Sequence, residues 1–502
     1  MTTASLSFGY STLLASPAVE YAANFTSISC CQALENAGLA NVLYPENALY
    51  GQRTESYWSI SAQMHPTCIV QPVSADEVSR AVTTLTSNIG CQFAVRSGGH
   101  LTWAGSNNID DGVTIDLGQM NTVSYDEATK VATMQAGANW GQVYEKLAPY
   151  GVAAVGGRAT QVGVTGFLLG GGNSFYTARH GLACDSVNNF EVVLSNGDII
   201  NANPQENADL FRVLKGGSGN FGIVTKIDIQ VFEASNLWGG VVLYPFSTAD
   251  QHIEAYVDWI NNVENYPDGS SILIWTYSPK VEDIVIFAAY EDTTGAVSPP
   301  GFDKFMEIPH AITSTLRVDS LLNLTTELNM PAGYRDIWST ATFKNDARVY
   351  HKANELHSRF VAEWKAQSPD GDFITQLVFQ ALPTIFASHS LAKGGNVFGL
   401  ESESENLVLL QFNLAINSVE QEVFGREKSR EFREALKAYA DEIGCSSRWV
   451  YLNYADSNQD PRGSYGPDNV VRMRAAAEKY DPDGVFQTRS QGGFKISKIQ
   501  TN

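Results

Sequence analysis

Three glycine-rich runs in the first half of the chain constrain its fold more than any other feature. They are Arg96-Ser97-Gly98-Gly99-His100, the stretch from Gly163 and Gly166 to Gly170-Gly171-Gly172, and Gly216 to Gly222. Glycine lets the backbone approach a ligand closely, and successive N–H groups in such runs form concave nests for anions. One run alone is typical of a tight turn between strands. Two such runs that line opposite sides of one site suit a long dinucleotide.

The third run contains the letters of a dinucleotide fingerprint, Gly217-x-Gly219-x-x-Gly222. That motif works only where it follows a strand and opens a helix, because the pyrophosphate then sits at the helix N-terminus. Here residues 209–215 have the pattern of a helix and residues 223–231 that of a strand. The order is reversed, so the sequence does not predict a Rossmann site for NAD.

Apolar periodicity predicts an α+β protein. Residues 69–96 read as strand, helix and strand, and further strands and a short helix follow up to Val231. After Phe232 helices alternate with aromatic-rich strands, and residues 272–277 are expected to pair with 284–290. An antiparallel sheet backed by helices is the economical arrangement there. Other expected elements are strands 93–96, 113–117, 131–136, 373–380 and 407–416, and helices 75–86, 140–147, 426–443 and 470–479.

The length of 502 residues exceeds what one hydrophobic core usually supports, so we expect more than one domain. The formal net charge of −21 disfavours nucleic acid and anionic membrane surfaces as partners. No run of eighteen apolar residues predicts a membrane span. We divide the chain into an arm (1–60), a first domain (61–235), a second domain (236–465) and a C-terminal return to the first domain (466–502).

The six cysteines show no C-x-x-C spacing. We expect buried thiols at Cys91 and Cys184, and a disulfide from Cys30 or Cys31 to Cys68. The sequons Asn24-Phe25-Thr26 and Asn323-Leu324-Thr325 permit glycosylation. Met1–Ala23 lacks a basic start and a continuous apolar core. We therefore expect a protein of the secretory pathway, secreted, whose native leader lies outside this sequence.

Two more motifs follow the glycine runs in a fixed order: Trp449-Val450-Tyr451-Leu452-Asn453-Tyr454 and Tyr480-Asp481-Pro482-Asp483-Gly484-Val485-Phe486. With them the chain resembles, over residues 60–495, the berberine-bridge-enzyme-like branch of the vanillyl-alcohol-oxidase flavoproteins. The fungal secondary-metabolism members are the ones that it resembles. The resemblance implies a PCMH-type FAD-binding domain of two subdomains and a separate substrate domain.

The resemblance also implies how FAD is attached. His100 matches the histidine that bonds the flavin 8α-methyl carbon, and Ala159 stands where many members carry a cysteine bonded to flavin C6. We therefore expect a single covalent attachment, through His100. The eight histidines show no metal-binding spacing, so no metal site is predicted. The other expected cofactor contacts are Arg96, Ser97, Gly98, Gly99, Val162, Gly163, Gly166, Gly170, Gly171, Gly172, Gly222, Ile223 and Val224.

Val162 matches the position of the family's oxygen gate, with ordinary core packing as the alternative.

Strand alternation in 449–454 places Tyr451 and Asn453 on one face. Gln411 stands where berberine bridge enzyme has a glutamate base, and an amide orients rather than accepts a proton. Tyr451 is therefore the expected base, with Gln411 and Asn453 positioning the substrate. A phenol has a pKa of about 10, so this base needs a nearby cation or a strong hydrogen bond.

The resulting hypothesis is an FAD oxidase of a small alcohol, amine, polyketide or alkaloid-type metabolite. Hydride goes to the flavin and O2 reoxidises it to give H2O2, and an oxidative cyclisation is one form of this reaction. An oligosaccharide oxidase is an alternative, with Trp275, Tyr277, Trp338 and Trp449 lining a groove. Ala159 favours the smaller substrate, because the family's oligosaccharide oxidases usually keep the second flavin bond. A non-redox cyclase that uses FAD only as a scaffold is the third hypothesis. The partners are thus a small molecule and O2, with the oligomeric state left open.

Overall fold

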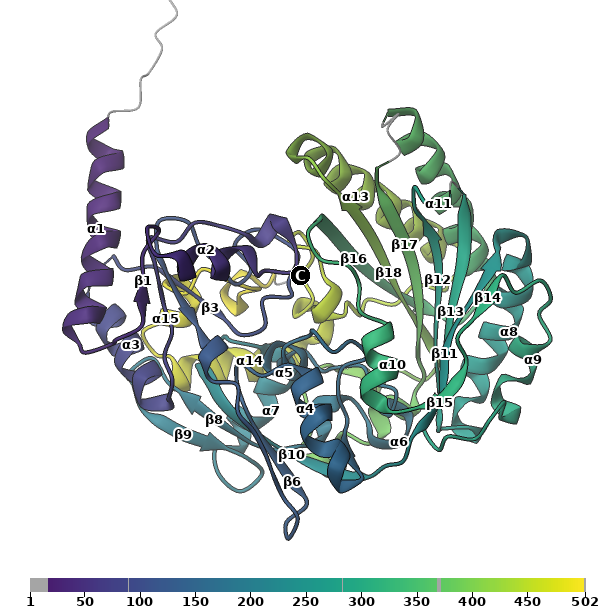
Figure 1. Ribbon diagram of the computed structural model, residues 1–502, viewed down its shortest axis with the longest axis horizontal. Helices are drawn as coiled ribbons and strands as arrows, with labels where there is room; N and C mark the ends of the chain where they lie inside the picture. The colour runs from purple at the N-terminus through teal and green to yellow at the C-terminus, as the bar shows by residue number, and fades with distance from the viewer. Residues whose placement is uncertain (1–16, 89, 282, 368–371, 501–502) are drawn as a thin grey trace, which may run out of the picture.

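The computed structural model describes residues 17–88, 90–281, 283–367 and 372–500, in which three β-sheets lie side by side (Figure 1). The segment Met1–Ala23, judged above to lack the features of a leader, lies mostly outside these residues, as do the side chains of the sequon at Asn24. None of the helices in the described part of the chain is both long and apolar enough to cross a membrane.

The first sheet is small and mostly parallel. Its order is β1 (Val42–Leu43), β2 (Cys68–Val70), β4 (Val113–Asp116) and β3 (Phe93–Arg96), and β4 pairs in parallel with both β2 and β3. The helix α3 (Ala75–Ser87) connects β2 to β3, as the sequence predicted. Ser74 caps its first turn, and Val78, Ala81, Val82 and Leu85 form its buried stripe.

The N-terminal helices belong to this first subdomain. Two disulfides, Cys30–Cys91 and Cys31–Cys68, fasten α1 (Pro17–Asn36) to it, with Cα–Cα distances of 5.9 and 6.1 Å. The second bond is one of the two that the sequence left open. The prediction of a free thiol at Cys91 is wrong, because α1 brings Cys30 beside Cys91 from 61 residues away. Cys184 is a buried free thiol, as predicted.

The second sheet is antiparallel, and the other two glycine runs lie in the segments that connect its strands. Its order is β5 (Val123–Asp126), β6 (Val131–Gln135), β10 (Ile223–Glu233), β8 (Val187–Val193) and β9 (Ile199–Ala202), and β7 (Val152–Ala154) also pairs with β10. Helices α4 (Trp140–Leu147), α5 (Val164–Leu169), α6 (Thr177–His180) and α7 (Ala208–Gly217) belong to the same part of the chain. The helix α7 precedes the third glycine run and β10 follows it, which is the order that excludes a Rossmann site.

The third sheet lies in residues 237–416, where the sequence predicted helices alternating with aromatic-rich strands. Its order is β14 (Thr313–Ser314), β11 (Leu237–Pro245), β13 (Ile284–Asp292), β12 (Gly269–Tyr277), β17 (Ile374–Leu382), β18 (Leu407–Ile416) and β16 (Arg335–Lys344), and β15 (Arg317–Asp319) pairs with β11. Every pairing is antiparallel, including that of β12 with β13. The predicted α+β class, with its antiparallel sheet backed by helices, is confirmed.

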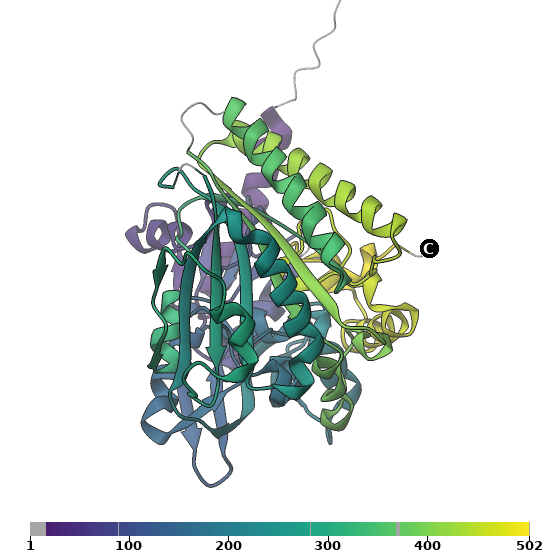
Figure 2. The ribbon, with the colours of Figure 1, turned by 90° about the vertical axis from the view of Figure 1, so that its right-hand side faces the viewer.

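Three long helices cover one face of this sheet: α8 (Ala249–Asn262), α11 (Ala347–Gln367) and α13 (Val419–Glu442) (Figure 2). Phe379 packs on Tyr350 of α11, and Phe412 packs on Phe432 of α13. Strand alternation then places Gln380, Gln411 and Trp338 on the opposite face, which is turned toward the second sheet.

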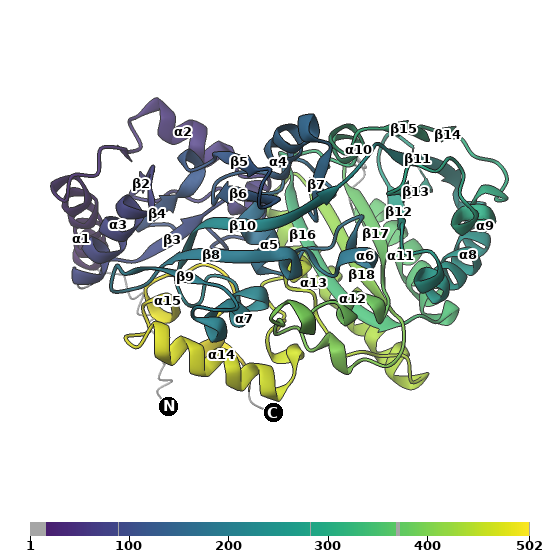
Figure 3. The same cartoon turned by 90° about the horizontal axis from the view of Figure 1, so that it is seen from below.

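The C-terminal segment returns to the first two sheets. The helix α14 (Pro467–Tyr480) packs against α7, and α15 (Val485–Thr488) follows it (Figure 3). The Phe93 N–H donates to the Arg489 carbonyl at 3.0 Å, so residues almost 400 positions apart in the sequence pair at the edge of the first sheet. Residues 449–454 differ from the prediction of a strand, because they run through an irregular stretch into a 3-10 turn, Leu452–Tyr454.

A buried carboxyl group lies where the arm meets the third sheet. Asp336 at the start of β16 is 2% exposed, its N–H donates to Ser59 Oγ at 3.0 Å, and its Oδ2 has no partner among the described residues. Burial raises the pKa of Asp336 to about 8, so the folded protein retains a proton that the unfolded chain releases near its ordinary value of about 4. The stability that this proton supplies is complete below that value and is lost as the pH rises to about 8.

We predict that Asp336→Asn gains stability relative to the parent as the pH rises from 5 to 8, and that the difference levels off above that. The slope should approach about 1.4 kcal/mol per pH unit, the effect of one proton. Chemical unfolding of both proteins at several pH values measures it. A difference that does not change with pH would contradict a protonated Asp336.

Candidate active site

The first two glycine runs meet backbone to backbone. A Cβ atom added to Gly98 would lie 2.7 Å from the Cα of Gly163, and one added to Gly163 would lie equally close to Gly98. Ser97 Oγ fixes this junction by donating to the Ala136 carbonyl at 2.6 Å. The end of β3 in the first sheet is thereby held against the start of α5 beside the second sheet. Only glycine at both positions allows this approach.

His100 lies directly after this junction and is held by aromatic rings. Its imidazole stacks on Trp58, with ring centroids 4.8 Å apart, and meets the edge of Trp338 at 6.4 Å. Burial lowers the pKa of His100 to about 4, so the ring is neutral at neutral pH. No described residue hydrogen-bonds either ring nitrogen. A neutral imidazole with a free nitrogen is the nucleophilic form of histidine.

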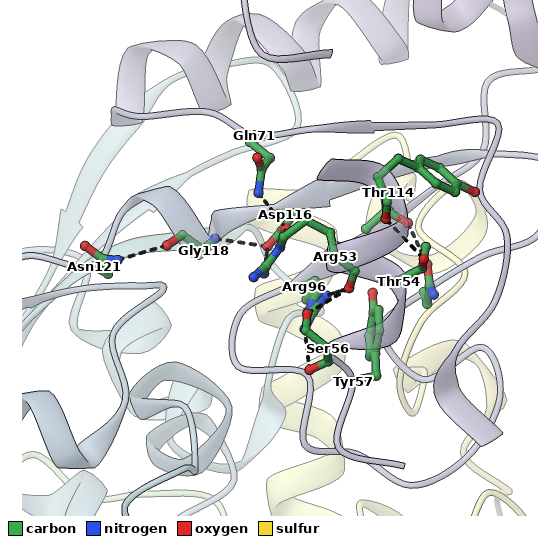
Figure 4. Close-up of polar contacts among 12 residues, drawn as sticks. Arg53, Thr54, Ser56, Tyr57, Gln71, Arg96, Thr114, Asp116, Gly118 and Asn121 are labelled. Atoms are coloured by element: carbon green, nitrogen blue, oxygen red, sulfur yellow. Dashed lines mark hydrogen bonds and ion pairs between the residues drawn. The ribbon is translucent and has the colours of Figure 1, made fainter. Parts of the chain in front are cut away.

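Trp58 is brought to His100 by a polar cluster that anchors α2 (Ala48–Glu55) (Figure 4). Arg53 forms a two-pronged ion pair with buried Asp116 at 2.6 and 2.9 Å, and Gln71 donates to the same carboxylate. Arg96 donates to the carbonyls of Arg53 and Ser56 and covers the ring of Tyr57 at 3.8 Å. The Arg96 guanidinium therefore holds the arm through its two Nη atoms, while its Nε has no partner among the described residues. Its contact with the cofactor stays a prediction.

The rest of the second glycine run lies against the segment 449–454. The side chain of Asn453 occupies the space where a Cβ of Gly170 would lie. The N–H groups of Gly172 and Asn173 donate to Tyr451 Oη at 3.1 and 3.0 Å. These donors are therefore engaged by a phenol. Gly166, by contrast, has no heavy atom within 4 Å of an added Cβ, so its surface is open.

The remaining expected cofactor contacts are part of the protein's framework. Val162 is half-buried against the core, and its carbonyl accepts from Trp140 N–H at 3.1 Å. A Cβ atom added to Gly222 would lie 2.8 Å from the carbonyl oxygen of Val193. Ile223 and Val224 are buried at the start of β10. Gly99 has a positive φ of 70°, and Gly171 one of 103°. That these residues contact the cofactor stays a prediction.

The three expected catalytic residues are only partly brought together. Asn453 Nδ2 donates to Tyr451 Oη at 3.2 Å, although the two do not lie on a strand. Gln411 donates instead to Asn413 Oδ1 at 2.8 Å, on the face of the third sheet that the long helices do not cover. No described hydrogen bond joins Gln411 to Tyr451. Burial raises the pKa of Tyr451, and the hydrogen bonds from Asn453 and Gly172 and the charge of Arg158 offset this only in part.

Three residues that sequence reasoning missed complete the site. Arg158 Nη2 donates to Gln380 Oε1 at 2.5 Å and to Tyr454 Oη at 3.1 Å. The Tyr454 ring in turn contacts the edges of Tyr451 and Trp338 at 4.8 and 5.9 Å. The cation that a tyrosine base requires therefore lies beside Tyr454. Alternation within 449–454 pointed Tyr454 away, because it assumed a strand.

The aromatic groove expected for an oligosaccharide is not formed by its four candidates. Trp275 and Tyr277 lie on the helix-covered face of the third sheet, where they contact Phe379 and Phe373. Trp449 is 2% exposed and donates to the Phe398 carbonyl. Of the four, Trp338 alone borders His100. Three of the four expected groove residues are therefore wrong, because their side chains pack inside the protein.

Comparison with known proteins agrees with this geometry. The FAD binding domain family matches residues 66–203. The FAD-dependent monooxygenase sdcF of Emericella nidulans is 40% identical over 472 residues, which cover 93% of this chain and 98% of that protein. The chain belongs to the same family of FAD-linked oxidoreductases as this fungal FAD-dependent monooxygenase.

Solved structures share the fold of this family member at low sequence identity. BBE-like 1 of Physcomitrella patens matches with a TM-score of 0.76 at 19% identity, covering 94% of this chain and 99% of that one. The glucooligosaccharide oxidase of Acremonium strictum, whose FAD is described as 6-S-cysteinyl and 8α-N1-histidyl, matches with a TM-score of 0.71 at 21% identity, covering 93% and 100%.

The residues of this family member fit FAD. His100 presents a neutral, unbonded ring at the junction of two glycine runs, and the surface of Gly166 is open nearby in the same run. A second link through cysteine has no candidate, because four cysteines form disulfides and the thiols of Cys184 and Cys445 are buried. Ala159 stands at the position that the sequence comparison assigned to the second link.

We predict that His100→Ala yields a folded protein whose flavin is lost or held without a covalent bond. The imidazole makes no hydrogen bond that the fold needs, so its removal should leave the disulfides and sheets intact. Acid precipitation followed by the absorbance of the supernatant measures the released flavin. Flavin that stays in the precipitate of the variant would exclude His100 as the attachment point.

The Gly98–Gly163 junction gives a separate prediction. Gly98→Ala should destabilise the protein by about 1–3 kcal/mol, the usual cost of overpacking, and should reduce its flavin content. Gly51→Ala is the matched control, because no atom lies within 4 Å of the added Cβ and the position is helical, so alanine should be neutral or stabilising there. Equal effects of the two substitutions in thermal unfolding would contradict the junction.

Proposed function

We propose that this FAD-linked oxidoreductase oxidises a small metabolite, an alcohol, an amine or a polyketide or alkaloid-type compound, with O2 as the final acceptor. The observation that carries the proposal is the neutral His100 ring between Trp58 and Trp338, where the glycine junction meets the face of the third sheet that the long helices do not cover. His100 would hold FAD by a single covalent bond. When bound, FAD takes a hydride equivalent from the substrate and passes its electrons to O2.

The relatives favour a small metabolite over an oligosaccharide. Proteins named FAD-dependent monooxygenases from fungi match over almost the whole chain, at up to 40% identity among those compared. The expected aromatic groove is absent from its four candidate positions, which supports the same choice. Whether oxygen ends in H2O2 or in the product separates an oxidase from a monooxygenase. Peroxide assay together with ¹⁸O2 labelling of the product distinguishes the two.

The protein's own part in the reaction is to orient the substrate and accept its proton. The amides of Gln411, Asn413 and Gln376 form a hydrogen-bonded row on the sheet face that the long helices do not cover, where they can orient substrate oxygen or nitrogen. Two phenols can take the proton. Tyr451 is the one expected from the sequence, and it is buried among N–H donors. Tyr454 is half-buried and accepts from Arg158, which favours it as the acceptor.

Substitution of each phenol assigns the role. Tyr454→Phe should slow anaerobic flavin reduction by substrate ~10²–10⁴-fold, the usual contribution of a positioned general base, while reoxidation by O2 hardly changes. Tyr451→Phe should have the smaller effect, through loss of the contacts to Gly172 and Asn173. Stopped-flow absorbance measures both rates. The opposite ranking would assign the proton to Tyr451, and parental rates in both variants would contradict a tyrosine base.

The test of the function itself is a spectrum. The purified protein should show the two visible flavin bands, and an anaerobic panel of metabolites should contain one that bleaches them. A protein that carries flavin but is bleached by no substrate, while converting one, would support the non-redox cyclase instead.

We further propose that the protein matures in the secretory pathway, because its two disulfides form and persist in oxidising compartments. The second sequon offers weaker support. Asn323 is exposed, but it lies in α10 (Leu321–Glu327), and the hydroxyl of Thr325 is buried against the Leu321 carbonyl.

A further inference from the structure

Arg158 is a cation without a counter-ion in a strongly acidic protein. The chain has 54 acidic residues against 33 lysines and arginines, yet none of the described carboxylates forms an ion pair with Arg158. Its Nη2 donates to Gln380 and Tyr454. Its Nε and Nη1 donate to no described residue, and neither nitrogen is sealed from solvent. The guanidinium therefore has unused donors in a half-buried position.

The charge of Arg158 acts on one buried carboxyl group, which does not neutralise it. Glu291 lies on β13, is 1% exposed, and its Oε2 has no partner among the described residues. Burial raises the pKa of Glu291 well above its usual range, and the charge of Arg158 opposes that shift without reversing it. A neutral Glu291 leaves the positive charge of Arg158 uncompensated.

Buried amides fix the direction of Arg158. Gln380 is 3% exposed, and its Oε1 also accepts from Asn173 Nδ2 at 3.3 Å. Asn173 is 6% exposed, and its backbone N–H holds Tyr451. The guanidinium is thus oriented before any ligand arrives, on the sheet face that contacts His100 through Tyr454 and Trp338. A preorganised donor contributes more to binding, because little side-chain entropy remains to be lost.

We propose that Arg158 binds an acidic oxygen of the substrate, a phenol or an enolised carbonyl group, and stabilises the charge that develops on it. This proposal rests on the proposed function and names the substrate class. Guanidinium N–H groups make their strongest hydrogen bonds to anionic oxygen. A phenol or enol is favoured over a carboxylate, because a net charge of −21 repels a permanently charged anion before it reaches the site. A weak acid arrives neutral and becomes charged beside Arg158.

The test uses the flavin-containing protein and three probes: 4-nitrophenol, its methyl ether 4-nitroanisole, and 4-nitrobenzoate. Equilibrium dialysis gives the affinity of each, and the absorbance of bound 4-nitrophenol shows whether it is ionised. The parent should bind the phenol more tightly than the ether and hold it as phenolate at a pH where the free probe is mostly neutral. Arg158→Gln should weaken phenol binding about 10- to 100-fold, the effect of a charged hydrogen bond, and leave the ether unchanged.

Two further variants and a control make the result specific. Arg158→Lys should keep part of the affinity, and Gln380→Glu should weaken phenol binding by giving Arg158 a counter-ion while the cation remains. Arg179→Gln removes the same charge from a position already paired with Asp268, and it should change nothing. Phenol binding that survives in Arg158→Gln would overturn the proposal, as would tighter binding of 4-nitrobenzoate. If the binding pattern holds but no metabolite reduces the flavin, the oxygen site stands and the proposed oxidation falls.

Discussion

The backbone contact between Gly98 and Gly163 determines where every other part of the site can lie. It joins the end of β3 in the first sheet to the start of α5 beside the second, with no side chain between them. His100 follows two residues later, and its ring is then fixed by Trp58 from the arm and Trp338 from the third sheet. A side chain at either glycine would separate the two runs and shift the imidazole with them.

A second junction brings the segment 449–454 to the same place. Asn453 lies on Gly170, and the phenol of Tyr451 receives N–H donors from Gly172 and Asn173. The glycine run thereby serves as a docking surface for protein, in addition to any role toward a cofactor. Because Asn173 also bonds Gln380, one short segment aligns both the tyrosines and the face of the third sheet. Charge and hydrogen bonding at the site then converge on Arg158 and Tyr454.

Local patterns in the sequence predict most of the fold, and long-range contacts account for what they miss. Strands such as Phe93–Arg96 and Leu407–Ile416, and the helix Trp140–Leu147, have the predicted bounds because apolar periodicity is a local property. Residues 449–454 have the alternation of a strand, but they pair with none. Ser447 and Ser464 accept the N–H groups of Trp449 and Val450 instead. Cys91 and Arg158 were misjudged or missed because their partners, Cys30 and Gln380, lie far away in sequence.

We propose that FAD is held by one covalent bond, at His100. Mass spectrometry of the intact, denatured protein, followed by peptide mapping, tests it most directly. We expect one flavin adduct per chain, located on the peptide that contains His100. An unmodified chain, two bonds to the flavin, or an adduct on a cysteine peptide would contradict it.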